Sequence, residues 1–298
     1  MKKVIITGAG GFIGSLLSKK LIDNNIAVVA VSACFNSDVF PDSPLITKIE
    51  TSISDSDQLI KLIPSGDYDA FYHLAWNGVN GPDKADPFIQ IENSKTAISC
   101  ALVAKELHCK KYLCAGTIAE RAVESLSNLE CTNPGMLYGT TKYCTHYLLE
   151  TYCKSIGLDF VWMQFSNCYG PTNKTGNLVS YTLSELSNNQ EATFGPALQP
   201  YDFIFIDDLI EAIYRLAFYN TRKTEYFIGS GNPRILKDYL IEIGDALGKP
   251  ELIKIGVRPD DGIIYKMSMF DVSVLKEDIG DYISVSFSDG IRITIDNY

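Results

Sequence analysis

The sequence has few basic residues and no long hydrophobic run. Its 298 residues contain 26 Lys and Arg against 36 Asp and Glu, so the formal net charge is -10. Broad binding of nucleic acid needs clustered cations, and this deficit argues against such a partner. No stretch approaches the ~20 apolar residues of a membrane span, and the N-terminus lacks the apolar core and cleavage site of a secretory signal. We therefore expect a cytoplasmic protein without a membrane partner.

Metal-binding patterns are also missing. The three histidines and eight cysteines are scattered, without Cys-x-x-Cys spacing, so we predict no metal site and interpret the cysteines as reduced structural thiols. The chain also lacks the Gly-Lys-Ser/Thr of a nucleoside triphosphatase loop, and that class is not supported.

Short β-branched runs alternate with amphipathic stretches through the first half of the chain. This alternation predicts strand–helix–strand units and an α/β fold with a doubly wound parallel sheet. The runs that carry the prediction are residues 4–7, 13–24, 27–31, 70–74, 91–107, 111–115, 136–155 and 159–164.

A glycine-rich turn follows the first of these strands. Gly8, Gly11 and Gly14 surround Phe12 and Ile13 at the first strand-to-helix junction. Glycine permits the tight turn and keeps side chains away from backbone amides that face a pyrophosphate. A glycine turn alone can be a simple tight connection, but its place at this junction favours a Rossmann-type dinucleotide site.

The second half of the chain has a different character. After residue 168, Gly, Asn, Pro and Thr separate shorter elements, and residues 193–200 are rich in turn formers. We predict a dinucleotide-binding domain over residues 1–168 and a smaller, mixed substrate-binding lobe over residues 169–298. Segments near 203–230 are regular enough to pack back against the first domain.

The end of the second strand bears on the choice of dinucleotide. Enzymes that use NAD usually place a carboxylate there, on the adenosine ribose. This chain has Ser32 instead, which can donate to a phosphate, so NADP(H) is favoured. No basic residue obviously accompanies it, and NAD(H) remains an alternative.

A tyrosine and a lysine stand four residues apart inside the helical pattern of residues 136–155. Tyr138 and Lys142 therefore share one helix face. A free tyrosine has a pKa of ~10, and a nearby ammonium favours the phenolate, so the pair can exchange a proton with a substrate oxygen. Such spacing also arises by chance, but here it follows the strand at 111–115 and Thr117, a third candidate for the same oxygen.

Together these motifs resemble the extended branch of the short-chain dehydrogenase/reductase superfamily, which includes nucleotide-sugar epimerases, dehydratases and 4-ketoreductases. The resemblance covers nearly the whole chain, and its motifs occur in the family's order. It implies further cofactor contacts from Leu74, Ala75 and Asn93, and substrate contacts from Trp76, Thr117, Asn167, Asn177, Leu178, Tyr201 and Arg258. Plainer alternatives are that the preceding His73 is a core residue, that Asn93 and Asn177 cap helices, and that Arg258 lies in a solvated turn.

Three departures from the family pattern matter. The serine-rich strand end of the family is Ala115-Gly116-Thr117 here, so Thr117 supplies the hydroxyl alone. Tyr201 stands where the family usually has Arg, which removes one expected contact to the substrate diphosphate. The residues after Thr117 are apolar, unlike the acidic pair of the dehydratases, although Glu120 follows one place further on.

The resemblance implies reduction of the 4-keto group of a nucleotide-activated 4-keto-6-deoxyhexose with NAD(P)H, in deoxysugar biosynthesis. The alternative is an NAD-dependent nucleotide-sugar 4-epimerase, which uses the same groups reversibly. A third hypothesis, a non-catalytic dinucleotide-binding sensor, is disfavoured because such relatives lose the tyrosine or the lysine. The resemblance also implies a homodimer through the helices at 91–107 and 136–155.

Overall fold

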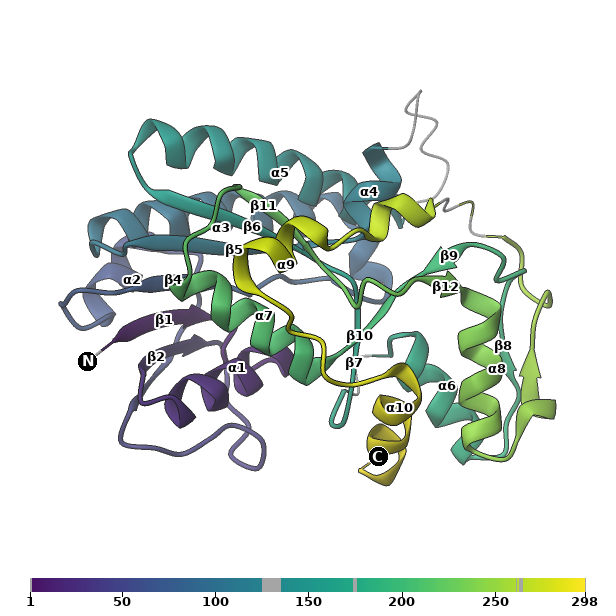
Figure 1. Cartoon of the computed structure of the whole chain (residues 1–298). Coiled ribbons are helices and arrows are strands. Elements are labelled where there is room, and N and C mark those ends of the chain that lie inside the picture. The colour runs from purple at the N-terminus through teal and green to yellow at the C-terminus, as the bar shows by residue number, and fades with distance from the viewer. Residues whose placement is uncertain (1, 125–134, 174–175, 261, 263–264, 298) are drawn as a thin grey trace.

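The computed structural model describes residues 2–124, 135–173, 176–260, 262 and 265–297. A seven-stranded sheet runs through its centre in the order β11-β6-β5-β4-β1-β2-β3, and every neighbouring pair is parallel (Figure 1). This arrangement confirms the predicted doubly wound α/β fold. The strands are β1 (Lys3–Thr7), β2 (Ala27–Ser32), β3 (Ile46–Glu50), β4 (Ala70–His73), β5 (Lys111–Thr117), β6 (Asp159–Phe165) and β11 (Glu225–Ile228).

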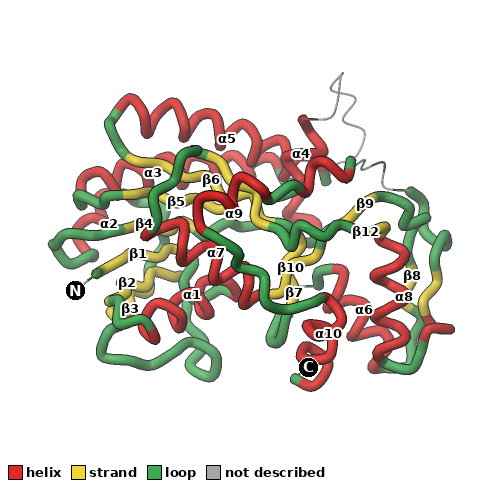
Figure 2. The backbone as a smooth tube through the Cα atoms, viewed as in Figure 1, coloured by secondary structure: helices red, strands yellow, loops and turns green. Residues whose placement is uncertain are grey.

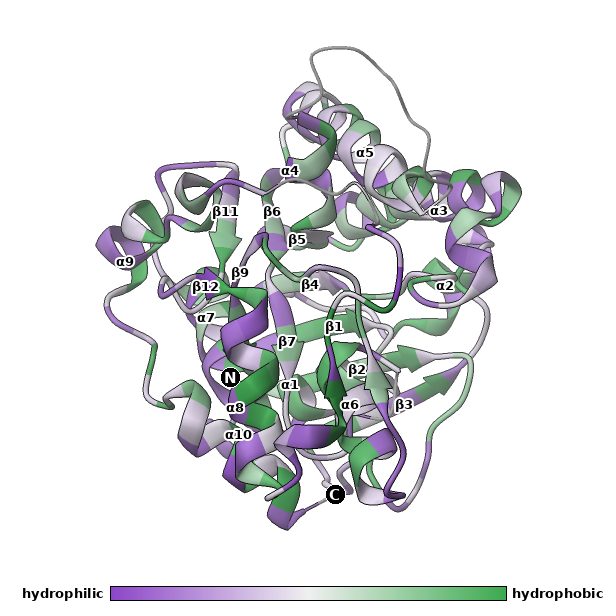
Figure 3. Cartoon of the chain, turned by 90° about the vertical axis from the view of Figure 1, so that its right-hand side faces the viewer, coloured by the Kyte–Doolittle hydropathy of each residue, from purple (hydrophilic) through white to green (hydrophobic). Residues whose placement is uncertain are grey.

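Alternate side chains of β1, β2, β4, β5 and β6 enter two separate cores, because successive residues of a strand point to opposite faces. In β1, Val4 and Ile6 belong to one core and Ile5 to the other. Strands buried on both faces are expected to be continuously apolar, and Figure 3 shows the central strands mostly in the hydrophobic colour.

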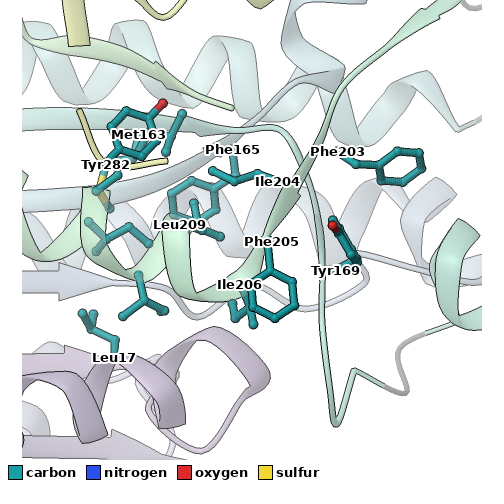
Figure 4. Close-up of a cluster of buried hydrophobic side chains, with 14 of the residues drawn as sticks. Leu17, Met163, Phe165, Tyr169, Phe203, Ile204, Phe205, Ile206, Leu209 and Tyr282 are labelled. Atoms are coloured by element: carbon teal, nitrogen blue, oxygen red, sulfur yellow. The ribbon is translucent and has the colours of Figure 1, made fainter. Parts of the chain in front are cut away.

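Helices cover both faces of the sheet (Figure 2). The core of Val4 and Ile6 is closed by α1 (Phe12–Asp23), α7 (Ile206–Phe218) and α9 (Ser273–Ile279). Leu17 of α1 and Leu209 of α7 lie together in this layer (Figure 4). The core of Ile5 is closed by α2 (Ser56–Leu62), α3 (Pro87–Glu106) and α5 (Met136–Ser155).

The remaining elements gather beyond the carboxyl ends of β6 and β11. Three short two-stranded sheets, β10-β7, β12-β9 and β13-β8, lie there with their helices (Figure 1). The elements are β7 (Asn167–Tyr169), α6 (Leu178–Ser187), β8 (Ala192–Thr193), β9 (Pro200–Tyr201), β10 (Phe203–Phe205), β12 (Arg234–Ile235), α8 (Leu236–Ala246), η2 (Pro250–Leu252), β13 (Ile253–Lys254), η3 (Met267–Phe270) and α10 (Phe287–Asp296).

The chain returns to the main sheet within this second half. After β10, α7 packs against α1, and β11 pairs with β6. These contacts lie in the segment near residues 203–230 that was expected to pack back. The proposed boundary between residues 168 and 169 stays a prediction.

The order of the strands reverses between β1 and β4. From β1 the chain adds β2 and β3 on one side, then crosses back to add β4, β5, β6 and β11 on the other. In open α/β sheets the loops at such a reversal part from one another, and ligands bind in the crevice outside the carboxyl ends of the strands. The glycine turn and the loop after β4 both leave the sheet at this point.

Several elements of the structure were not predicted. The strand β3 is half exposed and its sequence Ile-Thr-Lys-Ile-Glu is partly polar, as suits an edge strand. Two short helices, α4 (Ala119–Glu124) and the 3-10 turn η1 (Pro82–Ala85), lie in loops without hydrophobic periodicity. The helix predicted from residue 91 begins four residues earlier, at Pro87, where Asp86 caps it by accepting from two backbone N–H groups.

Candidate active site

The glycine turn lies in close contact with the loop that follows β4. Gly8 has φ of +76°, and a Cβ built there would lie 2.7 Å from the backbone nitrogen of Ala75. A Cβ at Gly14 would lie 2.2 Å from the carbonyl oxygen of Gly8. Only glycine fits at these two positions, and α1 begins between them, at Phe12, with its first N–H groups unpaired by the helix. The turn therefore fits the phosphates of a dinucleotide.

A cavity of about 700 Å³ extends from this turn into the second half of the chain. Most of the residues predicted for the site line it, on elements that are far apart in sequence. They are Gly8, Gly11, Phe12, Ile13, Gly14, Leu74, Trp76, Thr117, Tyr138, Lys142, Asn167, Asn177, Leu178 and Tyr201.

The predicted proton-transfer groups meet at one wall of this cavity. Tyr138 and Lys142 lie on the buried face of α5, and the Tyr138 side chain faces Thr117, the last residue of β5. The Lys142 ammonium donates to the carbonyl oxygen of Ala115 at 2.6 Å. The packing of α5 against β5 thus brings together three side chains that are up to 25 residues apart in sequence (117 to 142).

Burial opposes the charged forms of this pair. It raises the pKa of Tyr138 above its usual value, although the hydrogen bond from Thr117 acts in the other direction. Burial also lowers the pKa of Lys142. A phenol that stays protonated near neutral pH can donate its proton to a substrate oxygen, and the adjacent ammonium stabilises the phenolate that remains.

Trp76 forms the surface opposite the lysine. The Lys142 Nζ lies 3.4 Å from the centroid of the Trp76 ring, and Tyr138 meets the same ring edge-on at 6.4 Å. The Trp76 indole donates to the buried Gln90 of α3 at 2.9 Å. Gln90 also donates to the carbonyl oxygens of Gly78 and Asp83, which ties the loop to the helix.

Four predicted contacts are not among the residues that line the cavity: Ser32, Ala75, Asn93 and Arg258. Asn93 is bonded to the backbone of Asn77 in both directions, at 2.9 and 2.8 Å, and supports the loop that carries Trp76. Arg258 donates to the hydroxyl oxygens of Thr193 and Tyr181. Ala75 lies against Gly8, and Ser32 lies against the glycine turn, 2.8 Å from a Cβ built at Gly10.

The substrate side of the cavity is polar but contains few charges. The Tyr201 hydroxyl donates to Asn167 Oδ1 at 2.8 Å, so the residue that replaces the family's Arg is bonded to a predicted substrate contact. Asn177 caps α6 by accepting from the N–H of Ser180, and it donates to the carbonyl of Cys168. Asn177 therefore both caps α6 and lines the cavity, so the two interpretations of this residue are compatible.

His73 is a core residue in this structure. It is 1 % exposed, its Nδ1 lies 2.8 Å from the Thr7 hydroxyl, and burial lowers its pKa to about 3. Within the described part of the chain, no cluster of His, Cys, Asp or Glu has the arrangement of a metal site, and the seven cysteines there form no disulfide. Cys131 lies outside the described residues.

Several cavity residues were not found from the sequence. Lys84 of η1 lines the cavity and its Nζ lies 5.3 Å from the centroid of the Tyr138 ring. Other lining residues that were not predicted include Ile118, Gln199 and Tyr265. They come from loops and short elements in which no periodicity or motif distinguishes a ligand contact from an exposed residue.

Glu120 does not line the cavity, although it follows Thr117 closely in sequence. Its side chain is fully buried and points into the protein, where Trp162 and Gln164 of β6 donate to it. None of the described residues that line the cavity is Asp or Glu. The acidic pair expected of a dehydratase therefore has no counterpart on the described cavity wall.

The fold and the site together are those of an α/β protein with a glycine turn suited to a dinucleotide, and with Thr117, Tyr138 and Lys142 at one wall of the cavity. The model of the NAD dependent epimerase/dehydratase family matches residues 4–229, and the chain belongs to that family. This confirms the resemblance to the extended short-chain dehydrogenases/reductases.

Across the described residues, no helix combines the length and the apolarity that a membrane crossing requires.

Individual relatives include proteins with different activities. The chain is 24% identical to dTDP-4-dehydro-6-deoxyglucose reductase of Escherichia coli, over 84% of this chain and 83% of the relative. It is similar in structure to UDP-glucose 4-epimerase of Thermotoga maritima with UDP-glucose, with a TM-score of 0.82, 22% identity, and coverage of 99% and 98%. WbmF of Bordetella bronchiseptica, in complex with NAD+, has a TM-score of 0.79 with 24% identity and coverage of 99% and 92%.

We predict that Gly8→Ala weakens dinucleotide binding. The new methyl group would meet the backbone of Ala75, which cannot move like a flexible side chain, so the turn must open. Titration calorimetry with NAD+ and NADP+ measures the loss, which we expect to exceed tenfold in affinity.

The matched control is Gly81→Ala. Gly81 also has positive φ, +69°, but a Cβ there meets nothing within 4 Å. This variant therefore carries the conformational strain of a positive φ without the steric conflict. Equal affinities for the two variants would show that the close approach at Gly8 is not what shapes the site.

Proposed function

We propose that this protein reduces the 4-keto group of a nucleotide-activated 4-keto-6-deoxyhexose with NAD(P)H. The observation that carries the proposal is the meeting of Thr117, Tyr138 and Lys142 at a cavity without a described carboxylate. Such a site can add or remove a proton at a sugar oxygen, but it offers no described acid pair for elimination of water. The chemistry that it supports is interconversion of an alcohol and a ketone.

The roles of the three residues follow from their positions. When bound, the dinucleotide supplies the hydride that the carbonyl carbon accepts. Tyr138 donates its hydroxyl proton to the carbonyl oxygen, and Lys142 stabilises the phenolate. The Thr117 hydroxyl holds the same oxygen beside Tyr138, so that placement of the reacting groups contributes much of the acceleration.

The second candidate is an NAD-dependent nucleotide-sugar 4-epimerase. It would use the same three residues, first to remove the proton from the 4-hydroxyl and then to return it after the sugar has rotated to present its other face. The cavity without a described carboxylate favours this reaction as much as it favours reduction. The two differ in whether the dinucleotide leaves after each turnover or stays bound.

Two measurements distinguish the reductase from the epimerase: the amount of dinucleotide that copurifies with the protein, and the net oxidation of NADH or NADPH during turnover. We expect denatured protein to release less than stoichiometric dinucleotide, and the native protein to oxidise NADH or NADPH when a 4-keto-6-deoxyhexose nucleotide is added. Tyr138→Phe should lower kcat at least 100-fold while dinucleotide binding remains, because only the transferable proton is lost.

Two outcomes contradict the reductase. Stoichiometric NAD+ in the purified protein, with exchange of C4 epimers and no net consumption of reduced dinucleotide, would identify the epimerase. Full turnover by Tyr138→Phe would refute the assigned proton donor in either reaction.

The choice of dinucleotide depends on two neighbouring residues. Ser32 supplies no carboxylate, which by itself favours NADP(H). Glu50, however, is the direct partner of Ser32 on the adjacent strand, and it accepts from the N–H of Phe35 in the following loop. Paired residues of adjacent strands lie about 4.8 Å apart, so Glu50 lies at the same strand end as Ser32, where the resemblance implies the adenosine ribose. We propose that Glu50 disfavours the 2′-phosphate and shifts the preference towards NAD(H).

Glu50→Gln tests this proposal. Removal of the negative charge should lower the KM for NADPH by about threefold to tenfold relative to that for NADH, since an exposed charge acts through screened electrostatics. Glu251→Gln, an exposed residue far from β2, is the control. An unchanged ratio in Glu50→Gln would refute the role of this carboxylate.

We also propose that the outer faces of α3 and α5 pair with a second copy of the chain. Large apolar side chains are exposed there: Ile91 at 63%, Leu148 at 53% and Tyr147 at 50%. Around Leu148 and Tyr147, α5 carries a groove of about 650 Å³ with a mainly apolar lining. Two such faces can bury each other's apolar surface.

Light scattering measures the mass in solution. We expect twice the mass of one chain for the natural sequence, and a single-chain mass for Leu148→Glu, which places a charge in the pairing face. Leu62→Glu on α2, also an exposed leucine, should remain paired. A natural sequence that is monomeric at micromolar concentration would contradict the proposal.

A further inference from the structure

The Lys142 ammonium is buried without a direct ion pair. The residue is 2 % exposed, and none of the ion pairs between described residues includes it. Its Nζ lies between two indole rings, 3.4 Å from the centroid of Trp76 and 5.6 Å from that of Trp162. A buried charge is costly unless an opposite charge or hydrogen bonds compensate it. The carbonyl oxygen of Ala115 compensates it with one hydrogen bond but carries no negative charge, so any counter-charge comes from a group further away.

Four ionisable groups on the surrounding elements face this ammonium: His73 of β4, Cys114 of β5, Glu120 of α4 and Tyr138 of α5. Burial lowers the pKa of His73 to about 3 and raises that of Cys114 to about 12, so both are neutral near pH 7. Burial likewise keeps Tyr138 a neutral phenol. Glu120 is the one member of this set that can carry a negative charge near neutral pH.

Three donors fix the Glu120 carboxylate behind the site. Its Oε1 accepts from the backbone N–H of Thr117 at 2.6 Å. Its Oε2 accepts from the indole of Trp162 at 2.8 Å and from the amide of Gln164 at 3.0 Å. The indole of Trp162 that donates to this carboxylate also lies near the ammonium, with its ring centroid 5.6 Å from Lys142 Nζ. Burial raises the pKa of Glu120, and the three hydrogen bonds oppose that rise.

Gly116 makes room for this arrangement. A Cβ there would lie 2.3 Å from the Trp162 Nε1 and 2.8 Å from Glu120 Oε1. The serine that the family usually has at the strand end would collide with the buried pair. Gly116 and Glu120 are therefore one structural feature, because the buried carboxylate and the indole leave no room for a side chain at position 116.

Arg121 orients the amide that faces the carboxylate. Its Nε donates to Gln164 Oε1 at 2.8 Å, which directs the Gln164 amino group towards Glu120. The guanidinium also lies 3.7 Å from Glu225 of β11. Arg121 therefore forms its ion pair with Glu225, a more exposed carboxylate. It acts on Glu120 only by orienting the Gln164 amide.

We propose that Glu120 is a positioning residue that holds the backbone of Thr117 and provides the buried counter-charge that keeps Lys142 protonated. Its effect on turnover rests on the function proposed above, whereas its effect on the charge of Lys142 does not. Lys142 acts as an ammonium, so activity is lost as pH rises through its pKa. Without the carboxylate that pKa falls, and the loss moves to lower pH.

Tryptophan fluorescence reports the protonation of Lys142 without any substrate. The sequence has two tryptophans, and both rings face the ammonium. The relevant pH transition is the one that Lys142→Met abolishes. We expect Glu120→Gln to move its midpoint down by about one pH unit or more, which is the usual effect of a nearby opposite charge.

Glu124→Gln is the matched control, because it makes the same change one turn along α4 at an exposed position. Its midpoint should equal that of the natural protein. If Glu120→Gln does not fold, Gln164→Met provides the second test. It removes one hydrogen bond from the carboxylate, which favours the neutral acid and should lower the midpoint by a smaller amount. A midpoint that stays unchanged or rises in a folded variant overturns the proposal.

The kinetic measurement depends on the proposed reaction. In Glu120→Gln the alkaline limb of the kcat profile should move to lower pH by the same amount as the fluorescence midpoint, with KM for the sugar nucleotide nearly unchanged. A protein without any reductase or epimerase activity would refute the proposed function and leave the fluorescence result standing. A shifted midpoint with an unshifted kcat profile would overturn the role of Glu120 in turnover.

Discussion

The site depends on the close approach of two backbones at the point where the strand order reverses. Gly8 of the turn after β1 touches the peptide between Leu74 and Ala75 after β4, at a distance that no side chain at Gly8 would permit. This contact sets the floor of the cavity, because the α1 N-terminus and the loop of Trp76 leave the sheet from the same place. The wall of Tyr138 and Lys142 then follows from the packing of α5 against β5.

A second constraint is the burial of charge beside that floor. The ammonium of Lys142 and the carboxylate of Glu120 are both removed from water, and both lie beside Trp162. Each is held by groups that the fold brings from other elements: a carbonyl of β5 for the lysine, and a backbone amide, an indole and a side-chain amide for the glutamate. A low-dielectric surrounding strengthens the interaction between them, and it also makes either charge unfavourable alone. The proposed proton-transfer site and the core are for this reason joined by one set of hydrogen bonds, which runs through Lys142, β5, Glu120 and Trp162.

Much of the fold was accessible from the sequence because its signals are local. Alternating β-branched and amphipathic runs predicted the parallel sheet, and the glycine spacing located the turn after β1. Tyr138 and Lys142 share a helix face by their spacing alone. The family matched over residues 4–229 agrees with these expectations. Elements without periodicity were missed, among them the edge strand β3 and the short helix α4, since polar edges and single turns resemble loops in sequence.

The sequence by itself determined the alternation of strands and helices, the glycine turn after the first strand and the shared helix face of Tyr138 and Lys142, because these depend on backbone freedom and on spacing within one element. Only the tertiary structure decided what the neighbouring polar residues do. In it, the Glu120 side chain is buried in the core and does not line the cavity. Asn93 is hydrogen-bonded to the backbone of the loop at Asn77, and Glu50 is paired with Ser32 on the adjacent strand. These outcomes depend on which strands and helices become neighbours, and contacts between distant segments leave no periodic signal in the chain.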